Sequence, residues 1–212
     1  DATPTYFCHQ GDLSLLPGNR GLPEPGYTLA HTLYRLFPKT RLIIILRHPT
    51  DRLYSHYHHL LTNRTPLSPE AFHQNALTWI DKMERCLKRD SLKSCVFNQT
   101  FLNKFNLMPL TYSMYYPFAK TWLEVFPRKQ ICFIKSEDFY INRTLVMTEI
   151  FSFLGLDPRR RIEADDEHDQ YNTQYRSTML SKTRDLLDKY FRPLNHKLAD
   201  LVNDVRFRFE RG

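Results

Sequence analysis

The sequence predicts an α/β fold in which a parallel, doubly wound sheet is flanked by helices. Two short segments, residues 41–46 and 130–135, are dense in β-branched and aliphatic side chains, as buried strands are. Helical patterns separate them, and strands that alternate with helices form parallel sheets. A chain of 212 residues with 42% hydrophobic side chains can bury a sizeable core. We therefore expect a single domain over residues 1–212.

Local signals place the elements of the first half. Pro49 ends the first strand and suits the entry of a helix, which we expect over about 50–61. Ser68-Pro69 is a good helix start, because a capping hydroxyl is followed by proline at the first helical position. That helix is predicted to run to about Leu87. The segment 96–110 carries several asparagines and a proline, and we expect it to be irregular.

The second half is predicted to hold four more helices around the second strand. Two of them cover about 112–125 and 144–154, and Gly155 is a usual residue just past a helix end. Residues 157–170 are strongly charged and are expected to form a mobile loop. Two C-terminal helices, about 178–190 and 194–204, are expected to be broken at Pro193.

Charge and hydropathy limit the partners. A formal charge of +7 and a pI near 9.2 favour an anionic partner, which could be nucleic acid, an anionic membrane surface or a sulfated polysaccharide. There is no run of 18 apolar residues, so no segment is expected to span a membrane. The chain starts at Asp1 rather than at a methionine, and we expect it to be incomplete at its N-terminus.

Arg47 and Ser55 form the main candidate binding site. Arg47 follows the first strand directly, and open α/β sheets bind ligands at the carboxyl ends of their strands. Ser55 lies about one to two turns into the next helix. A guanidinium and a hydroxyl beside a helix N-terminus make a good phosphate site. The alternative is a strand–turn–helix unit whose arginine is merely solvated.

The same stretch carries a resemblance to a known family. Residues 46–57 read L-R-H-P-T-D-R-L-Y-S-H-Y and resemble the 3′-phosphate-binding segment of sulfotransferases that use 3′-phosphoadenosine 5′-phosphosulfate (PAPS). Residues 115–126, 130–138, 151–156 and 191–195 resemble further segments of that family. Together with the Cys86-x8-Cys95 spacing, they are most similar to the Golgi N-acetylgalactosamine 4-sulfate 6-O-sulfotransferase type. The resemblance covers nearly the whole chain and implies the P-loop-like sulfotransferase fold.

The resemblance also implies a function. A sulfuryl group would move from PAPS, a co-substrate, to a sugar hydroxyl of a glycosaminoglycan such as chondroitin or dermatan sulfate, in the Golgi lumen. It implies no metal and no nucleic-acid partner, and any membrane anchor would lie in a segment absent from this chain. The 5′-phosphosulfate loop and the catalytic base are expected upstream, because the glycines at 18 and 21 have neither the lysine nor the preceding strand. The catalytic residues are therefore unknown.

Roles for individual residues follow from the resemblance. Arg47 and Ser55 would hold the 3′-phosphate of the cofactor. Arg176 would close over the cofactor, unless it is an ordinary solvated loop arginine. Arg52 is expected to be structural, either pairing locally or facing solvent. Glu137 and its neighbour Asp138 are expected to be a structural acid pair at the end of the second strand.

Two other functional classes stay open. The chain could be a catalytically inactive, polysaccharide-binding relative of the family. A nucleotide-dependent kinase would need a Walker-type loop and magnesium carboxylates, and neither is visible. The histidines at 48, 56, 58 and 59 cluster in sequence, but no cysteine or carboxylate completes a metal site there.

Sequons and cysteines indicate the secretory pathway. Asn63, Asn98 and Asn142 each begin an N-x-[ST] tripeptide, which is a weak signal singly and a stronger one in threes. Cys86 and Cys95 are either two reduced thiols or a disulfide that closes a short basic loop. We expect the disulfide, given the sequons. Cys132 lies in an apolar run and is expected to be a buried free thiol, and Cys8 has no evident partner.

The resemblance implies one more property of residues 1–212. The family sheet has an earlier strand that carries the 5′-phosphosulfate loop. We therefore expect an exposed edge on strand 41–46 or 130–135 and uncovered apolar surface, which promotes association. Alone, these residues are expected to be inactive and poorly soluble.

Overall fold

The fold is built around two parallel strands. A computed structural model describes residues 7–8, 13, 16–61, 68–157 and 178–210. Strands β1 (Leu42–Leu46) and β2 (Ile131–Lys135) pair in parallel, with Leu42 opposite Ile131 and Leu46 opposite Lys135. Because the pairing is parallel, both strands end at the same edge of the sheet, as the sequence predicted.

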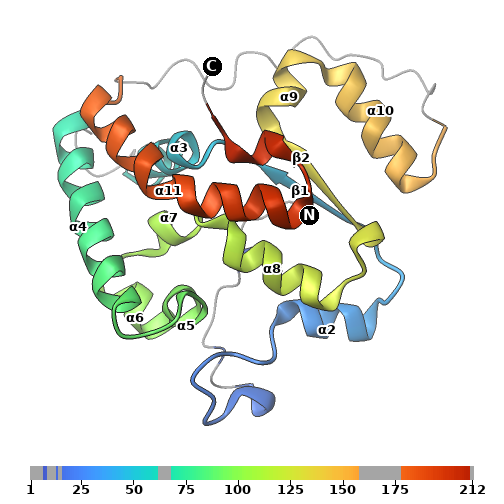
Figure 1. Cartoon of the computed structure of the whole chain (residues 1–212), viewed down its shortest axis with the longest axis horizontal. Coiled ribbons are helices and arrows are strands. Elements are labelled where there is room, and N and C mark those ends of the chain that lie inside the picture. The colour runs from blue at the N-terminus through green and yellow to red at the C-terminus, as the bar shows by residue number, and fades with distance from the viewer. Residues whose placement is uncertain (1–6, 9–12, 14–15, 62–67, 158–177, 211–212) are drawn as a thin grey trace.

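Helices surround this strand pair (Figure 1). Those before β2 are α2 (Leu29–Leu36), α3 (Pro49–Leu61), α4 (Pro69–Leu87), α5 (Leu92–Phe97), α6 (Gln99–Lys104), α7 (Met108–Thr111) and α8 (Tyr115–Val125). Those after it are α9 (Ser136–Ile141), α10 (Arg143–Leu154) and α11 (Ser181–Val202). Short 3-10 helices are η2 (Pro17–Asn19), η3 (Arg128–Gln130) and η5 (Val205–Arg208). None of the described helices is both long and apolar enough to cross a membrane.

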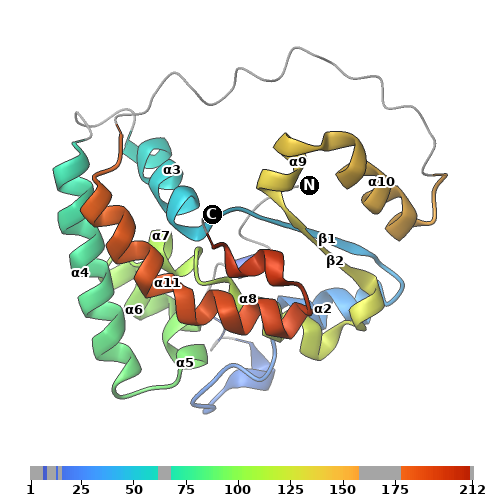
Figure 2. The ribbon, with the colours of Figure 1, turned by 45° about the horizontal axis from the view of Figure 1, so that its top comes forward.

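The two faces of the sheet carry different helices. Successive side chains of a strand point to opposite faces. On one face Leu46 and Phe133 pack with residues of α8, α11 and η5 in one apolar cluster. On the other face Cys132 and Ile134 pack against residues of α9 and α10. Figure 2 shows α9 and α10 on one side of the strands and α8 with α11 on the other. Helices on both faces make this a doubly wound α/β arrangement.

One half of the second face is bare. Ile43 and Ile45 of β1 are 38% and 61% exposed, although their neighbours in β2 are buried. Among the described residues, β1 pairs with β2 alone, so its other edge is open. The predicted uncovered edge and apolar surface are both present on β1.

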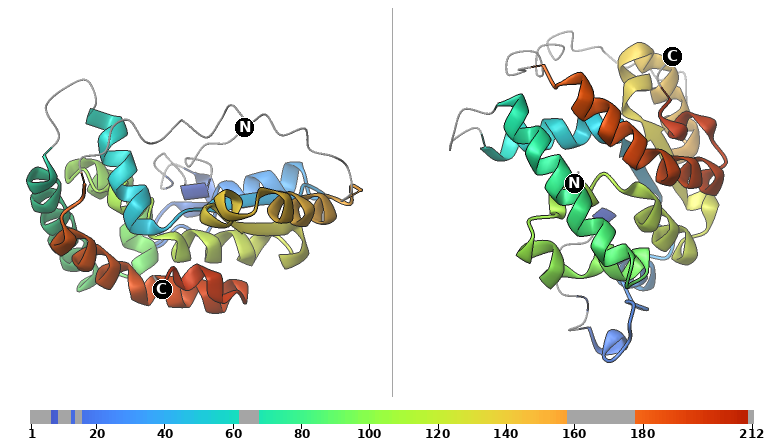
Figure 3. Two further views of the ribbon diagram at one scale, coloured as in Figure 1. Left: turned by 90° about the horizontal axis from the view of Figure 1, so that it is seen from above. Right: turned by 60° about the vertical axis from the view of Figure 1, so that its left-hand side comes forward.

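A second apolar cluster joins the remaining helices. Side chains from α3, α4, α5 and α11 share it, and α4 lies beside α11 (Figures 1 and 3). The predicted bridge between Cys86 and Cys95 is present at the end of α4 and within α5. The loop around η2 projects from this helical body at the bottom of the view (Figure 3, right).

Most predicted boundaries hold within one to three residues, but α2 and α9 were not predicted and two expectations were wrong. Residues 96–110 are mostly helical rather than irregular, because parts of α5, α6 and α7 occupy them. The Asn98 side chain that suggested a loop caps α6, accepting a hydrogen bond from the backbone N–H of Phe101 at 2.9 Å.

The two C-terminal helices are in fact one, α11, and Pro193 lies inside it. Proline in a helix interior costs about 3 kcal/mol. Leu187, Phe191 and Leu198 are all buried along α11, on both sides of the proline. Their burial, at about 1.5–3 kcal/mol for each large apolar side chain, outweighs that cost. The charged segment predicted as a loop falls largely outside the described residues.

Candidate functional site

The structure places Arg47 and Ser55 on the same strand–turn–helix unit. Arg47 directly follows the last residue of β1, and α3 begins two residues later at Pro49. Ser55 lies in the second turn of α3, about 9 Å along the axis from Pro49 at 1.5 Å per residue. Both side chains are half-buried. The geometry therefore agrees with the predicted position at the carboxyl edge of the sheet.

The charge of Arg47 is not used within the described part of the chain. Its guanidinium makes no hydrogen bond or ion pair with any described residue, whereas its backbone carbonyl accepts one. Lys135, opposite Leu46 at the end of β2, adds a second cation at this edge. Its ammonium lies 5.8 Å from the ring centroid of Phe209, a cation–π contact, and it makes no ion pair with a described residue. Two cations at this edge of the sheet, of which Arg47 lies just before the start of α3, suit an anionic ligand.

Sequence reasoning gave Lys135 no role. Only the register, in which Leu46 pairs with Lys135, puts it at the same edge of the sheet as Arg47. A usable signal was present, because each predicted strand ends in or is followed by a basic residue, and parallel strands end at one edge.

Residues 47–51, which we call the β1–α3 turn, are bonded from three directions. From one side, Tyr115 Oη donates to the carbonyl of Arg47 at 2.9 Å. From beyond β2, Glu137 Oε1 accepts from the backbone N–H of His48 at 2.7 Å. From α11, Asp188 accepts from the Thr50 hydroxyl at 2.6 Å, and Arg184 pairs with Asp51 at 2.9 Å. The turn is therefore fixed by α8, α9 and α11 together.

Arg52, the second arginine of the motif, differs from expectation in its surroundings. It is structural, as predicted, but it neither pairs locally nor faces solvent. Its Nε donates to the Ser113 hydroxyl at 2.7 Å, and its Nη2 donates to the carbonyl of Pro109 at 2.5 Å. Ser113 in turn donates to the carbonyl of Pro49 at 3.0 Å. Burial lowers the pKa of Arg52, yet an arginine remains protonated at neutral pH.

The contacts of Glu137 and Asp138 are structural, as the sequence suggested. Glu137 holds the β1–α3 turn, and Asp138 binds Arg206 of η5 at 3.0 Å. Arg206 also contacts Asp204 at 2.7 Å and Glu149 at 3.8 Å. Burial of Asp204 opposes its ionisation, but the hydrogen bonds from Arg206 outweigh it and lower the pKa of Asp204. This network joins η5 to α9 and α10.

The C-terminal segment covers the carboxyl edge. Phe209 is buried, and its ring lies 5.7 Å from that of His48 and 6.2 Å from that of Tyr115, between centroids. The His48 ring also lies 3.9 Å from Asp188. His48 thus has a packing role in the core beside the site.

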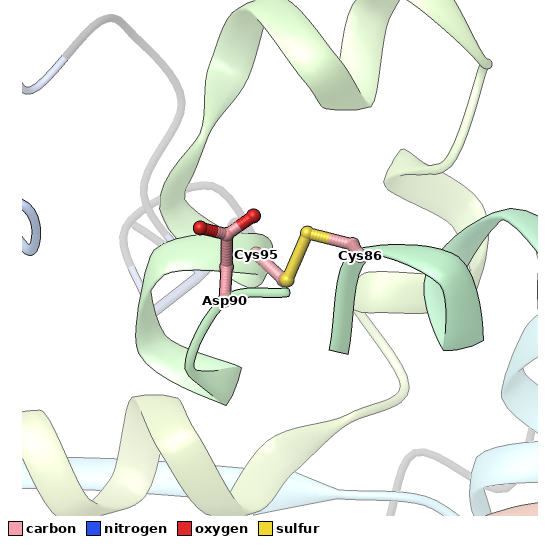
Figure 4. A group of neighbouring side chains, drawn as sticks. All are labelled: Cys86, Asp90 and Cys95. Atoms are coloured by element: carbon pink, nitrogen blue, oxygen red, sulfur yellow. A yellow bond between two sulfur atoms is a disulfide. The ribbon is translucent and has the colours of Figure 1, made fainter. Parts of the chain in front are cut away.

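A candidate metal group is excluded by its own chemistry. Cys86, Asp90 and Cys95 bring one ligand atom each to within 4.8 Å of one another (Figure 4). Because the two sulfurs are joined in a disulfide, neither is a thiolate that could bind an ion. The two remaining cysteines are buried and free, as predicted for Cys132. Burial raises the pKa of Cys132 to about 11 and that of Cys8 to about 12, so both stay protonated at neutral pH.

A cavity of about 310 Å³ lies beside this disulfide, away from Arg47. The loop around η2 and the segment from α4 to α6 form it, and Asp90, Ser94 and Gln99 supply polar lining. Ser94 donates to the carbonyl of Pro23 at 2.6 Å, and Ser91 donates to Glu24. The disulfide-closed loop therefore holds one wall of the cavity in place.

The remaining candidate residues are Arg176 and the three sequon asparagines. Arg176 and Asn63 lie outside the described residues. Asn98 and Asn142 are exposed and cap α6 and α10, each through its side-chain oxygen. That arrangement leaves their amide nitrogens, where an N-glycan is attached, uninvolved in the capping bonds.

Comparisons with known proteins add to this geometry. The family described as "Sulfotransferase domain" matches residues 20–196. Carbohydrate sulfotransferase 15 of Homo sapiens is 29% identical over 194 residues, which cover 88% of this chain and 34% of that protein. The protein of the same name from Nototodarus sloanii is 28% identical over 153 residues, covering 68% of this chain and 96% of that protein.

The fold also matches a solved structure. The crystal structure of a sulfotransferase from Alicyclobacillus acidocaldarius superposes with a TM-score of 0.58 at 23% identity, covering 85% of this chain and 62% of that one. This likeness shows a shared fold. The chain spans about a third of the length of the human relative that it matches.

Proposed function

Because this chain belongs to the sulfotransferase domain family, we propose that its protein transfers a sulfuryl group from PAPS to a sugar hydroxyl of a polysaccharide. The activity is that of the whole protein, of which these residues supply part of the donor site. Arg47 and Ser55 bind the 3′-phosphate of the donor. Lys135 adds positive charge at the same edge of the sheet.

One observation carries the proposal. Arg47 is half-buried at the carboxyl edge and its guanidinium has no partner among the described residues, while the backbone beneath it is held from three directions. A charge that protein groups leave unpaired at a partly buried position is free to pair with a ligand. Arginine suits a phosphate because its planar donors bind two oxygens at once.

The chemistry needs in-line positioning and stabilisation of charge on the leaving phosphate. A base must also take the proton of the acceptor hydroxyl. Arg47 and Ser55 fix the donor rather than break bonds, and no described residue is assigned as the base.

Chondroitin or dermatan sulfate is the acceptor that we propose, acted on in the Golgi lumen. The relatives at 28–29% identity are named carbohydrate sulfotransferases, and a net charge of +7 favours a sulfated chain. The disulfide supports an oxidising compartment, and N-glycans on Asn98 and Asn142 would agree with it.

The donor site is tested by calorimetry on the full-length protein. Arg47→Ala should weaken binding of adenosine 3′,5′-bisphosphate by about 1.5–3 kcal/mol, the worth of a hydrogen bond to a charged group. Arg41→Ala is the matched control, because it removes the same charge just before the opposite end of β1. Unchanged affinity in Arg47→Ala would show that the phosphate lies elsewhere.

A further inference from the structure

One peptide group at the site is held at both of its polar atoms. The peptide that joins Arg47 to His48 presents the Arg47 carbonyl at one end and the His48 N–H at the other. Tyr115 Oη donates to that carbonyl at 2.9 Å, and Glu137 Oε1 accepts from that N–H at 2.7 Å. The two side chains come from different helices, one from the first turn of α8 and one from the first turn of α9.

The side chains of Tyr115 and Glu137 are both suited to hold this peptide in one orientation. Tyr115 is 4% exposed, and burial raises the pKa of its hydroxyl, so it stays a neutral donor across the physiological range. The Glu137 bond pairs a carboxylate with a backbone N–H, a charge-assisted hydrogen bond that is stronger than a neutral one. Register places Glu137 there, because Lys135 is opposite Leu46 and Glu137 lies two residues beyond it.

These two hydrogen bonds fix the direction in which the Arg47 side chain leaves the backbone. The plane of a peptide is set by the ψ angle of the residue before it and the φ angle of the residue after it. Hydrogen bonds at both the carbonyl and the N–H prevent this peptide plane from rotating between the end of β1 and the start of α3. The Cα–Cβ direction of Arg47 is then set before any ligand arrives, so less ordering remains for binding.

We propose that Tyr115 and Glu137 are positioning residues that clamp the Arg47–His48 peptide and so aim the Arg47 guanidinium at the donor. This inference rests on the proposed function, in which Arg47 binds the 3′-phosphate. Neither side chain touches the ligand in this scheme. Each acts through Arg47 alone.

The test compares two ligands that differ only in the phosphate concerned. For each variant of the full-length protein, calorimetry gives the affinity for adenosine 3′,5′-bisphosphate and for adenosine 5′-monophosphate. The ratio of the two affinities measures use of the 3′-phosphate and is insensitive to a general loss of folded protein. Tyr115→Phe and Glu137→Ala should each lower that ratio about tenfold, which corresponds to 1.4 kcal/mol. Glu137→Gln keeps a side-chain oxygen acceptor and should restore most of the ratio.

Matched controls come from the same helices. Thr121→Val removes another buried hydroxyl from α8, one that donates to the carbonyl of Pro117 rather than to the turn. Asp138→Ala removes the neighbouring carboxylate of α9, which binds Arg206. Both should leave the affinity ratio unchanged, whatever they do to the melting temperature.

Each outcome decides one question. A wild-type ratio near one overturns the proposed phosphate site, and the clamp with it. A large wild-type ratio that Arg47→Ala abolishes but that Glu137→Ala and Tyr115→Phe leave intact overturns the clamp alone. If Tyr115→Phe does not fold, Glu137→Ala decides, because Glu137 is only half-buried.

Discussion

Removing the Cys86–Cys95 disulfide should destabilise the protein by about 3–4 kcal/mol. The bridge has a sequence separation of 9. For a closed loop of about ten residues, the chain-entropy relation gives about 2.7 kcal/mol at 25 °C. Both cysteines are buried, so replacing them with alanine also removes two packed sulfur atoms, a further cost of about 1 kcal/mol.

The perturbation is the double variant Cys86→Ala/Cys95→Ala, compared with wild type in denaturant and thermal unfolding. A loss of this size should lower the melting temperature by roughly 6–16 °C for a chain of this length. Because Ser91 and Ser94 lie in the closed loop and bond Glu24 and Pro23, hydrogen exchange should also quicken there.

The control is Cys8→Ala, which removes a buried free sulfur without opening a loop. A reducing agent should shift the wild type and the Cys8→Ala variant but not the double variant. Non-reducing peptide maps of protein secreted from animal cells should first show the bridge, with glycosidase-sensitive mass on Asn98 or Asn142. A double variant as stable as the wild type, or two free thiols in the map, would refute the reasoning.

Two further predictions concern surfaces. The double variant Ile43→Thr/Ile45→Thr should reduce self-association of residues 1–212 in sedimentation experiments, because it removes exposed apolar area yet keeps β-branched residues in β1. The control is Leu77→Gln, which removes an exposed apolar side chain from α4. Equal effects of the two variants would count against the β1 surface. Arg206→Ala should lower the free energy of unfolding by about 1 kcal/mol at pH 7, because it removes the ion pairs with Asp138 and Asp204. Since Arg206 lowers the pKa of Asp204 in the folded state, this difference should be fully present above the ordinary aspartate pKa of 3.8 and fade as the pH falls through the lower pKa of the folded protein. A difference that persists in urea titrations well below pH 3.8 would assign the loss to packing instead.

The sequence predicted the elements of the fold correctly where the determining signal was local. The apolar runs gave β1 and β2, and Ser68 gave the start of α4, where its hydroxyl accepts from the N–H of Ala71 at 3.0 Å. Asn98 misled because an asparagine favours loops and helix caps alike, and only its neighbours in space decide between them. Pro193 misled for the converse reason, because burial along α11 outweighs a local preference.

The position of the candidate residue Arg47 in the fold was predictable, but the contacts that hold the turn around it were not. Arg47 and the strand end that places it are neighbours in sequence. The groups that hold the turn are not, since Tyr115 is 68 residues from Arg47 and Glu137 is 89 residues from His48. Such contacts depend on the register of β2 and the packing of α8, which no local pattern encodes. Arg176 remains a prediction.

The two arginines of the motif show why a motif alone does not assign a ligand contact. Both lie near the start of α3, and a sequence pattern gives each a positive charge at the site. Arg52 donates hydrogen bonds to the Ser113 hydroxyl and to the carbonyl of Pro109, and Ser113 in turn donates to the carbonyl of Pro49. The Arg47 guanidinium donates no hydrogen bond to a described residue. In the proposed site, loss of Arg52 therefore affects donor binding only by loosening the turn, whereas loss of Arg47 removes the charge itself. A variant of Arg52 that weakens donor binding would therefore be no argument that Arg52 touches the phosphate.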